Sequence, residues 1–539
     1  MLSFTSFDRI TTHIFPSTPP ISTDGPSELS TTHHHDLVAP NVLLHHVSSC
    51  DQSTSYDPCL QILLTADADR LTINILPDDV LLLVFRFDRE IYLNELDTFD
   101  QLHPSWKWYR LVHVCRRWRF VGFASPNFLD LKLVCGPSTR VELTGIWPPL
   151  PIALRNTIYC PMPGDYNFDA VIVHHNRVSE IGLHLTHSQL RRLASAMLKQ
   201  FPALIHLSLC FRRTDRHTVP ALPDEFLGGS VPRLQSLELD SIIFPALPRL
   251  LLSATNLVRL RLLNIPRYRH MLKALVTSLG VLANLEYIDI GFKSPSYSAY
   301  QENRRPPPPT RIVLPALTSL NFKGSSKLLE DLVALIDAPL LHFFTITFFP
   351  QPIYDTPRLA QFMRHATMFK ALNEVHVDIY SKGIRVGSSF SPTLDGRFGL
   401  SISCGDFFWR HSSTAIYTSL LATIYTAEHL YIYWPRHSPP PYWKEGVDEF
   451  HWLEVFRPFT AVKNLYVSKG LEQCIAFALE ELVEEKRTDL LPALESLFFE
   501  EHVSGLSKEA IGQFLATRRL LGHTVTVSRW EEVGETAFR

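Results

Sequence analysis

The sequence predicts an α/β protein in which a small helical module precedes an open stack of parallel strands and helices. Three observations favour this fold class. An apolar run beginning at Val80 follows a Leu-Pro-Asp-Asp start, which predicts a helix. A leucine pattern then recurs about ten times from residue 204 onward, at a spacing typical of stacked repeats. Finally, 539 residues exceed one ordinary domain unless the core grows along one axis.

The composition argues against several classes of partner but does not identify a particular one. The chain has 51 basic and 54 acidic residues, so its net charge of −3 favours neither nucleic acid nor an anionic membrane. The eight cysteines include no C-x-x-C pair and no zinc-ligand spacing. No signal peptide or membrane-spanning run is apparent, which predicts a cytoplasmic or nuclear protein. We expect no cofactor and no metal.

The composition of the N-terminal region predicts little regular structure. Residues 1–67 are rich in Ser, Thr, His, Pro and Asp and lack a sustained periodicity. A chain of this composition cannot bury enough apolar surface to offset the entropy lost on folding. We therefore expect a disordered segment.

A first helix is predicted immediately after Pro77. Proline suits the first helical position, and Asp78 and Asp79 place negative charge at the positive end of the helix dipole. The next six residues, 80–85, are all apolar, so such a helix would bury two faces: one against its own core and one against a partner. A buried β-strand is the alternative for this apolar run, but the Pro-Asp-Asp start argues for a helix.

A second apolar helix is predicted near Trp118, with arginines filling the gaps between its apolar residues. LPDDVLLLVF, LVHVCRRW and FASPNFLDLKL, in this order, resemble an F-box, and in particular a fungal family of F-box proteins with leucine-rich repeats. The resemblance implies a module over residues 68–135, with a loop at 86–106 that is longer than a compact F-box has. It also implies docking to the Skp-type adaptor of a cullin-RING ubiquitin ligase through Leu76, Pro77, Val80, Leu81, Val84, Phe85, Val114, Cys115 and Trp118.

The sequence pattern changes after this module. Residues 136–167 contain the proline-rich stretch IWPPLPIAL and are predicted to form an extended connector. Residues 168–539 then alternate helical stretches with short strands of one form: a leucine, two variable residues, and two apolar residues separated by one more variable residue. These segments start at Leu204, Leu234, Leu257, Leu285, Leu317, Leu340, Leu372, Leu430, Val462 and Leu494.

This recurrence predicts a leucine-rich-repeat-like solenoid, in which each unit buries its apolar face against its neighbours. Side chains alternate along a strand, so the residues between the core positions point outward. They form a mixed surface with aromatic and arginine side chains, which dominate binding energy at interfaces. We expect a target protein to bind Glu238, Arg259, Arg261, Tyr287, Asp289, Asn321, His376 and Tyr466.

Together, the resemblance and the repeats predict the substrate-recognition subunit of an SCF-type ubiquitin ligase, a protein without enzymatic activity of its own. Two alternatives remain open. One is a repeat scaffold outside any ligase. The other is a (β/α)₈ barrel hydrolase, because Asp240, Asp378, Glu500 and Glu501 follow predicted strands and paired carboxylates can hydrolyse a glycoside.

Overall fold

The structure is a computed structural model in which the beginning of the chain is not described. The predicted disordered segment 1–67 therefore lies outside the described residues, and so do two proline-rich stretches of the sequence, 304–309 and 439–441. The described residues are 76–94, 111, 114–125, 129, 131–135, 150–156, 172–211, 221–265, 269–294, 311–349, 356–365, 372–380, 383–388, 399–404, 426–434, 452–484, 490–500 and 505–530.

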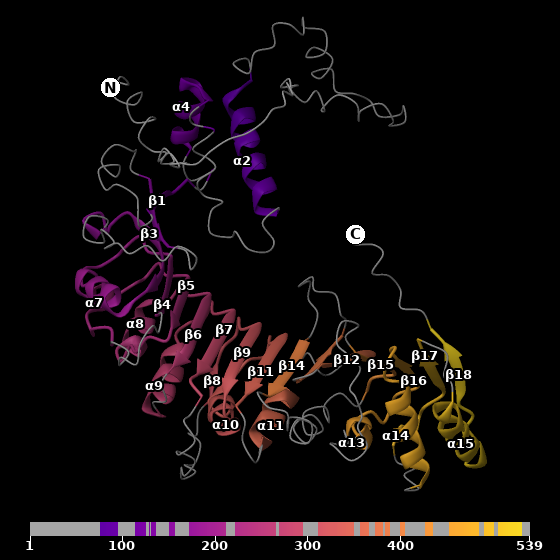
Figure 1. Ribbon diagram of the computed structural model, residues 1–539. Coiled ribbons are helices and arrows are strands. Elements are labelled where there is room, and N and C mark those ends of the chain that lie inside the picture. The colour runs from indigo at the N-terminus through magenta and orange to yellow at the C-terminus, as the bar shows by residue number, and fades with distance from the viewer. Residues whose placement is uncertain are drawn as a thin grey trace, which may run out of the picture. The chain divides into compact units, whose positions relative to one another are not determined.

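Two helices open the described chain: α2 at Asp78–Asn94 and α4 at Arg116–Ala124 (Figure 1). The acidic first turn of α2 is as predicted. The predicted loop 86–106 is wrong over residues 86–94, which continue α2 because RFDREIYLN contains neither glycine nor proline to end it. Residues 95–106 lie outside the described part of the chain.

A small apolar core joins the two helices. The ring of Phe85 lies 4.9 Å from that of Trp118, centroid to centroid. The Arg117 guanidinium donates hydrogen bonds to the Asp78 carboxylate, at 2.6 and 3.1 Å, and to the Leu76 carbonyl oxygen, so the starts of the helices are tied together. The buried apolar residues of this cluster are Leu81, Phe85, Trp118, Val121, Leu129, Leu131 and Leu150.

The remainder is dominated by one mostly parallel sheet, which has 16 strands in the described residues. Its edges are β1 and β18, which do not pair with each other, so this sheet does not close into a barrel. In spatial order the strands are β1 Leu133–Cys135, β2 Ile152–Arg155, β3 Val178–Leu185, β4 His206–Phe211, β5 Ser236–Asp240, β6 Arg259–Ile265, β7 Tyr287–Phe292, β9 Ser319–Gly324, β11 Phe343–Phe348, β14 Gly399–Cys404, β13 Gly383–Gly387, β12 Glu374–Tyr380, β15 His429–Tyr433, β16 Asn464–Val467, β17 Ser496–Phe499 and β18 Thr526–Arg529.

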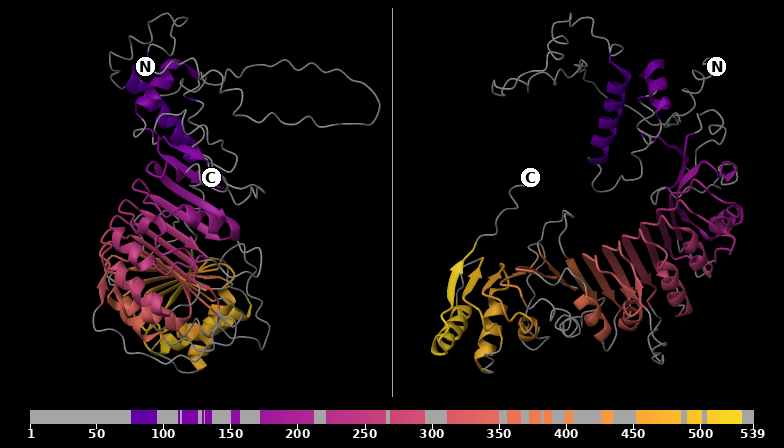
Figure 2. Two further views of the ribbon diagram at one scale, coloured as in Figure 1. Left: turned by 90° about the vertical axis from the view of Figure 1, so that its left-hand side faces the viewer. Right: turned by 180° about the vertical axis from the view of Figure 1, so that it is seen from behind.

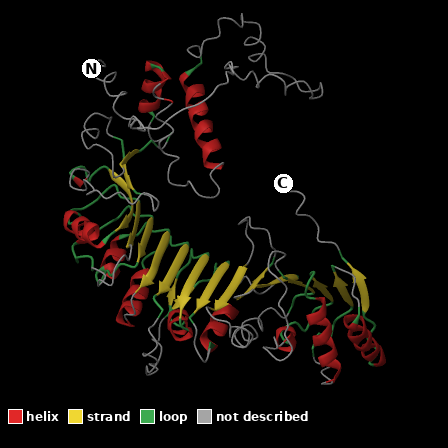
Figure 3. Cartoon of the chain, viewed as in Figure 1, coloured by secondary structure: helices red, strands yellow, loops and turns green. Residues whose placement is uncertain are grey.

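Helices cover one face of this sheet (Figures 1 and 3). A 3₁₀ turn, η5, lies at Phe226–Gly229, and a separate two-stranded sheet joins β8 at Ile312–Val313 to β10 at Ile336–Asp337. The helices are α7 His187–Ala196, α8 Leu247–Ser253, α9 Arg269–Leu279, α10 Ser326–Val333, α11 Pro357–His365, α13 Trp452–Phe456, α14 Glu472–Glu484 and α15 Leu506–Leu520.

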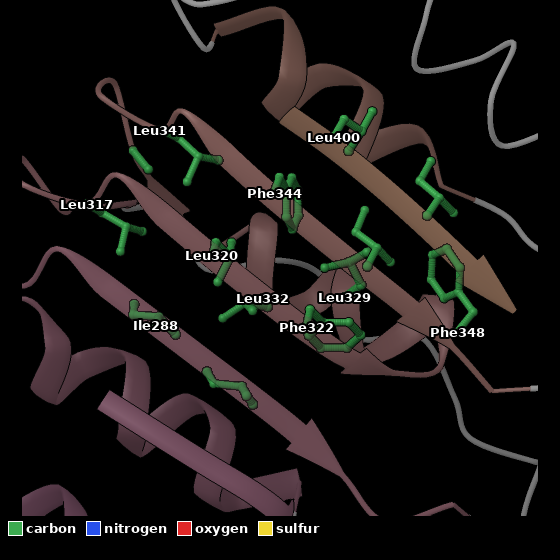
Figure 4. Close-up of a cluster of buried hydrophobic side chains, with 14 of the residues drawn as sticks. Ile288, Leu317, Leu320, Phe322, Leu329, Leu332, Leu341, Phe344, Phe348 and Leu400 are labelled. Carbon is green, nitrogen blue, oxygen red and sulfur yellow. The ribbon is translucent and has the colours of Figure 1, made fainter. Parts of the chain in front are cut away.

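The leucine pattern explains where the core lies. Each predicted segment runs into a strand, and its apolar positions align across neighbouring strands: Leu237 is in register with Leu260, and Leu260 with Ile288. These side chains are buried between the sheet and the helices. Figure 4 shows one section of this core, where Leu320 and Phe344 from the strands lie near Leu329 and Leu332 of α10. Each fully buried aliphatic side chain contributes roughly 1.5–3 kcal/mol.

The parallel order is interrupted once. From β12 the chain turns back into β13, which is antiparallel to both its neighbours, and β14 then returns beside β11. β15 resumes the parallel series on the other side of β12. The expectation of parallel strands throughout is therefore wrong at β13, because the turn from β12 is too short for the crossover that a parallel neighbour requires.

The start of the sheet also differs from the prediction. The predicted connector 136–167 contains a strand, β2, at Ile152–Arg155. The prolines of the stretch IWPPLPIAL lie just before this strand, where the missing N–H group costs no hydrogen bond of the sheet. β1, at the end of the predicted module 68–135, pairs with β2 and belongs to the sheet. Over the described ranges, no helix combines the length and apolar composition needed to cross a membrane.

Candidate functional site

The candidate site is the sheet face opposite the helices, which is seen from two further directions in Figure 2. The described helices from α7 to α15 all lie on the other face. Because side chains alternate along a strand, the residues between the buried leucines point to this face. The eight predicted target-binding residues occupy such positions on β5, β6, β7, β9, β12 and β16. The structure places five of them in a polar network and two in an aromatic ladder, and leaves Arg259 outside both.

The polar network is centred on Arg261. Its Nη1 lies 3.0 Å from Oε1 of Glu238 and its Nε 3.3 Å from Oδ2 of Asp289, one strand away on either side. The Tyr287 hydroxyl lies 3.5 Å from the Asp289 carboxylate and accepts a hydrogen bond of 2.7 Å from the Asn321 amide. These polar groups therefore satisfy one another across four strands.

Burial and charge act against each other in this network. Burial lowers the pKa of Arg261, but the Glu238 and Asp289 carboxylates outweigh it and leave that pKa above its ordinary value. Burial raises the pKa of Asp289, and the nearby guanidinium offsets only part of the effect. The predicted residue Arg259 differs because it is exposed at the start of β6. A ligand binding here would have to compete with ion pairs that already exist.

The aromatic ladder consists of His376, Tyr431, Tyr466 and Phe498, which are in register on β12, β15, β16 and β17. Successive ring centroids are 4.4, 4.2 and 4.5 Å apart, and interplanar angles of 7–10° make each contact a stack. All four side chains are half-buried. Most of their faces are taken up by stacking, so the parts of the ladder that solvent reaches are ring edges not covered by neighbouring side chains.

Trp530 closes one side of the ladder. Its Nε1 donates a hydrogen bond of 3.2 Å to the Val467 carbonyl oxygen, and its ring meets the rings of Tyr431, Tyr433 and Tyr466 edge-on at 5.7–6.1 Å. Burial, the neighbouring Tyr466 and the Glu374 carboxylate raise the pKa of Tyr431 to about 12. The Tyr431 hydroxyl is therefore harder to ionise than that of an ordinary tyrosine, which is itself protonated at neutral pH.

Sequence reasoning selected His376 and Tyr466 but missed the rest of this cluster. Tyr431 and Phe498 occupy the same position of the strand pattern, so applying the alternation to β15 and β17 would have found them. Trp530 follows the edge strand β18 and no repeated segment precedes it, so the sequence gives no signal for its packing.

The structure places the predicted adaptor-binding residues in three environments. Leu81, Phe85 and Trp118 are buried in the core of the helical module, where they join its helices rather than face a partner. Cys115 accepts the Trp118 N–H with its sulfur, at 3.4 Å, and so caps the N-terminus of α4. Those that reach the surface are Pro77, Val84 and Val114, which are exposed, and Leu76 and Val80, which are half-buried.

Next to that core, α2 carries an exposed apolar stripe. Leu83, Val84 and Phe87 are 48%, 40% and 62% exposed, and Val80 lies on the same side of the helix at the i−4 position from Val84. Leu83 and Phe87 are neighbours that were not selected from the sequence. Neighbouring large apolar side chains that remain exposed are unusual on a soluble protein, so this stripe is a candidate surface for a partner.

Of the acidic residues that suggested a hydrolase, the three that the structure describes, Asp240, Asp378 and Glu500, do not form a pair. Asp240 lies on β5 and Asp378 on β12, seven strand positions away, which is about 34 Å at the usual strand spacing. Glu500 follows β17, three positions from β12, or about 14 Å. Both separations exceed the roughly 5–9.5 Å between the carboxylates of glycosidases. Glu501 lies outside the described residues, and in the part described no group of three His, Cys, Asp or Glu residues is arranged to hold a metal ion.

Comparison with known proteins adds no family assignment. No protein-family model matches the chain, and no curated protein gives a significant match.

Proposed function

We propose that this chain is the substrate-recognition subunit of an SCF-type ubiquitin ligase. In this proposal α2 and α4 form an F-box that docks onto a Skp-type adaptor, and the sheet and its helices form a leucine-rich-repeat-like solenoid that binds the target. The chain performs no chemistry itself. It raises the effective concentration of the bound target near the ubiquitin-charged enzyme.

The observation that carries the proposal is the double apolar character of α2. Leu81 and Phe85 satisfy one face within the module, while Val84 and Phe87 leave a second apolar face in solvent. A helix that served only its own small core would need only one apolar stripe. The Leu-Pro-Asp-Asp start and the Val-Cys-Arg-Arg-Trp block, which resemble an F-box, coincide with these two helices.

Co-purification with a Skp-type adaptor tests the proposal. Val84→Glu and Val114→Glu each place a charge on an exposed residue, so the fold should survive while adaptor binding weakens about tenfold or more. Leu252→Glu is the matched control, because Leu252 is 53% exposed on α8, outside the helical module. Undiminished adaptor binding by a chain that carries both substitutions, or no binding by the unchanged chain, would refute the assignment.

The same experiment distinguishes the repeat scaffold that acts outside any ligase. A scaffold of that kind would bind its target through the sheet but would not retain the adaptor. Ubiquitination of the bound target in a reconstituted ligase would then be absent, whichever variant was used.

A further inference from the structure

The aromatic ladder is bordered by two carboxylates on β12. Glu374 and Asp378 lie two residues before and two after His376, so all three side chains point to the same face. In register on β15, Glu374 is opposite His429 and Asp378 is opposite Tyr433. Negative charge therefore stands beside the first ring of the ladder.

These carboxylates are poorly neutralised compared with those of the polar network. Asp378 has Arg385 at 3.9 Å, and the Arg385 side chain is 59% exposed. Glu374 is exposed and has no cationic partner in the described part of the chain. Burial raises the pKa of Asp378, an effect that the distant guanidinium only partly offsets. A cation supplied by a ligand would improve the electrostatic environment of both groups.

The ladder sets the length and direction of a complementary ligand. It runs across β12, β15, β16 and β17, a distance of about 14 Å at the usual strand spacing. An extended peptide covers that distance with about four residues. Ring edges rather than ring faces are exposed, and Trp530 covers the edges of Tyr431 and Tyr466 on one side only. Aliphatic or aromatic side chains can therefore lie along the open side of the row, while a lysine or arginine stem crosses it and places its charge beside β12.

We propose that the ladder binds an extended segment of the target protein with a lysine or arginine beside Glu374 and Asp378 and with apolar side chains at alternate positions after it, facing the row formed by Tyr431, Tyr466 and Phe498. The inference rests on the proposed function only in identifying the partner as a ubiquitination target. The polar network around Arg261 is not part of this site, because its charges are already paired.

An array of synthetic peptides, probed with the purified full chain, tests the inference. Each peptide carries a window of four varied residues between Gly-Ser flanks, and the window combines basic, acidic, polar and apolar residues in every order. The chain should bind windows with one basic residue next to apolar residues at least about tenfold more strongly than the acidic equivalents, a ratio that charge complementarity can supply.

Three variants locate the binding surface. Glu374→Lys should weaken binding to the basic windows about fivefold, as expected for loss of an exposed charge pair, and Asp378→Asn should weaken it in the same direction. Glu286→Lys is the control, since Glu286 is also an exposed glutamate but lies just before β7, away from the ladder. The control should bind the array as the unchanged chain does.

Several results would overturn the inference: no binding to any window, a preference for acidic windows, or an unchanged profile in Glu374→Lys. The adaptor result is separate. If Val84→Glu loses the adaptor but keeps the array profile, both proposals stand. If the unchanged chain binds basic windows but not the adaptor, the ligase assignment fails and the ladder site remains. If it binds the adaptor but no window, only the ladder site fails.

Discussion

Glu180 on β3 offers a sharp test of how the start of the sheet is stabilised. Its side chain is only 5% exposed, and its carboxylate accepts hydrogen bonds from Lys132, at 2.6 Å, and from Arg155. Lys132 directly precedes β1 and Arg155 ends β2, so one carboxylate links three neighbouring strands. Replacing it with the isosteric glutamine removes the charge but keeps the volume.

The magnitude follows from the two charged hydrogen bonds. Each is worth about 1.5–3 kcal/mol when shielded, but the Lys132 and Arg155 side chains are 20% and 34% exposed, so solvent screens both. We therefore expect Glu180→Gln to lower the free energy of unfolding by about 2 kcal/mol at neutral pH. The exposed glutamate Glu286, changed to glutamine, is the control and should have little effect.

The pH dependence has a definite sign. Burial raises the pKa of Glu180, but the hydrogen bond from Lys132 and the charges of Lys132 and Arg155 outweigh it and leave that pKa below its ordinary value of 4.5. The stabilisation is therefore present above pH 4.5 and is lost as the pH falls through the folded-state pKa. Urea unfolding from neutral to acidic pH should show the gap between wild type and Glu180→Gln closing. A gap that stays constant, or widens in acid, would refute the reasoning.

Three further predictions concern other parts of the sheet and its helices. Glu330→Ala should cost about 1–3 kcal/mol of stability in urea unfolding, because this buried carboxylate accepts two backbone N–H groups at the start of α11, at 2.8 and 2.9 Å; an unchanged midpoint would contradict it. A spectrophotometric titration should show a tyrosine that ionises near pH 12, and Tyr431→Phe should remove it; if it persists, another phenol is responsible. Arg518→Met should lower the thermal midpoint, because the Leu490 and Leu491 carbonyl oxygens that this arginine binds would lose their donor, whereas Arg519→Met on the same helix should not.

The sequence was most informative where one strand pattern recurs. The pattern predicts strands at β4 to β7, β9, β11, β12 and β15 to β17. It recurs because each of these strands must bury a leucine and alternate apolar residues beneath the helix layer. Near β2 proline density masked the strand, since prolines that precede a strand look the same in sequence as prolines that prevent one. β13 was missed because its sequence, from Gly383 to Gly387, does not contain the leucine-led pattern. This strand is an antiparallel return from β12 and not the start of another repeat.

The candidate site was harder to predict than the fold. Alternation correctly places Glu238, Arg261 and Asp289 on the face without helices, but it cannot show that they pair with one another, since the pairing depends on register between strands over 20 residues apart. The stack of Tyr431 on Tyr466 could not be predicted for the same reason: each strand contributes a single ring, and the contact depends on the register between the two strands.

The sheet face is divided into paired charges and stacked rings, and this division affects where a bound ligand would gain the most binding free energy. Binding over Arg261 would desolvate two ion pairs that already satisfy each other, so new contacts would first have to offset that loss. Binding over the ladder removes ring edges from water without breaking a stack, and it brings a cation to Glu374, whose charge is not neutralised within the described chain. Desolvation therefore favours the aromatic half of the face for affinity, and the polar half is better suited to hold neighbouring strands in register.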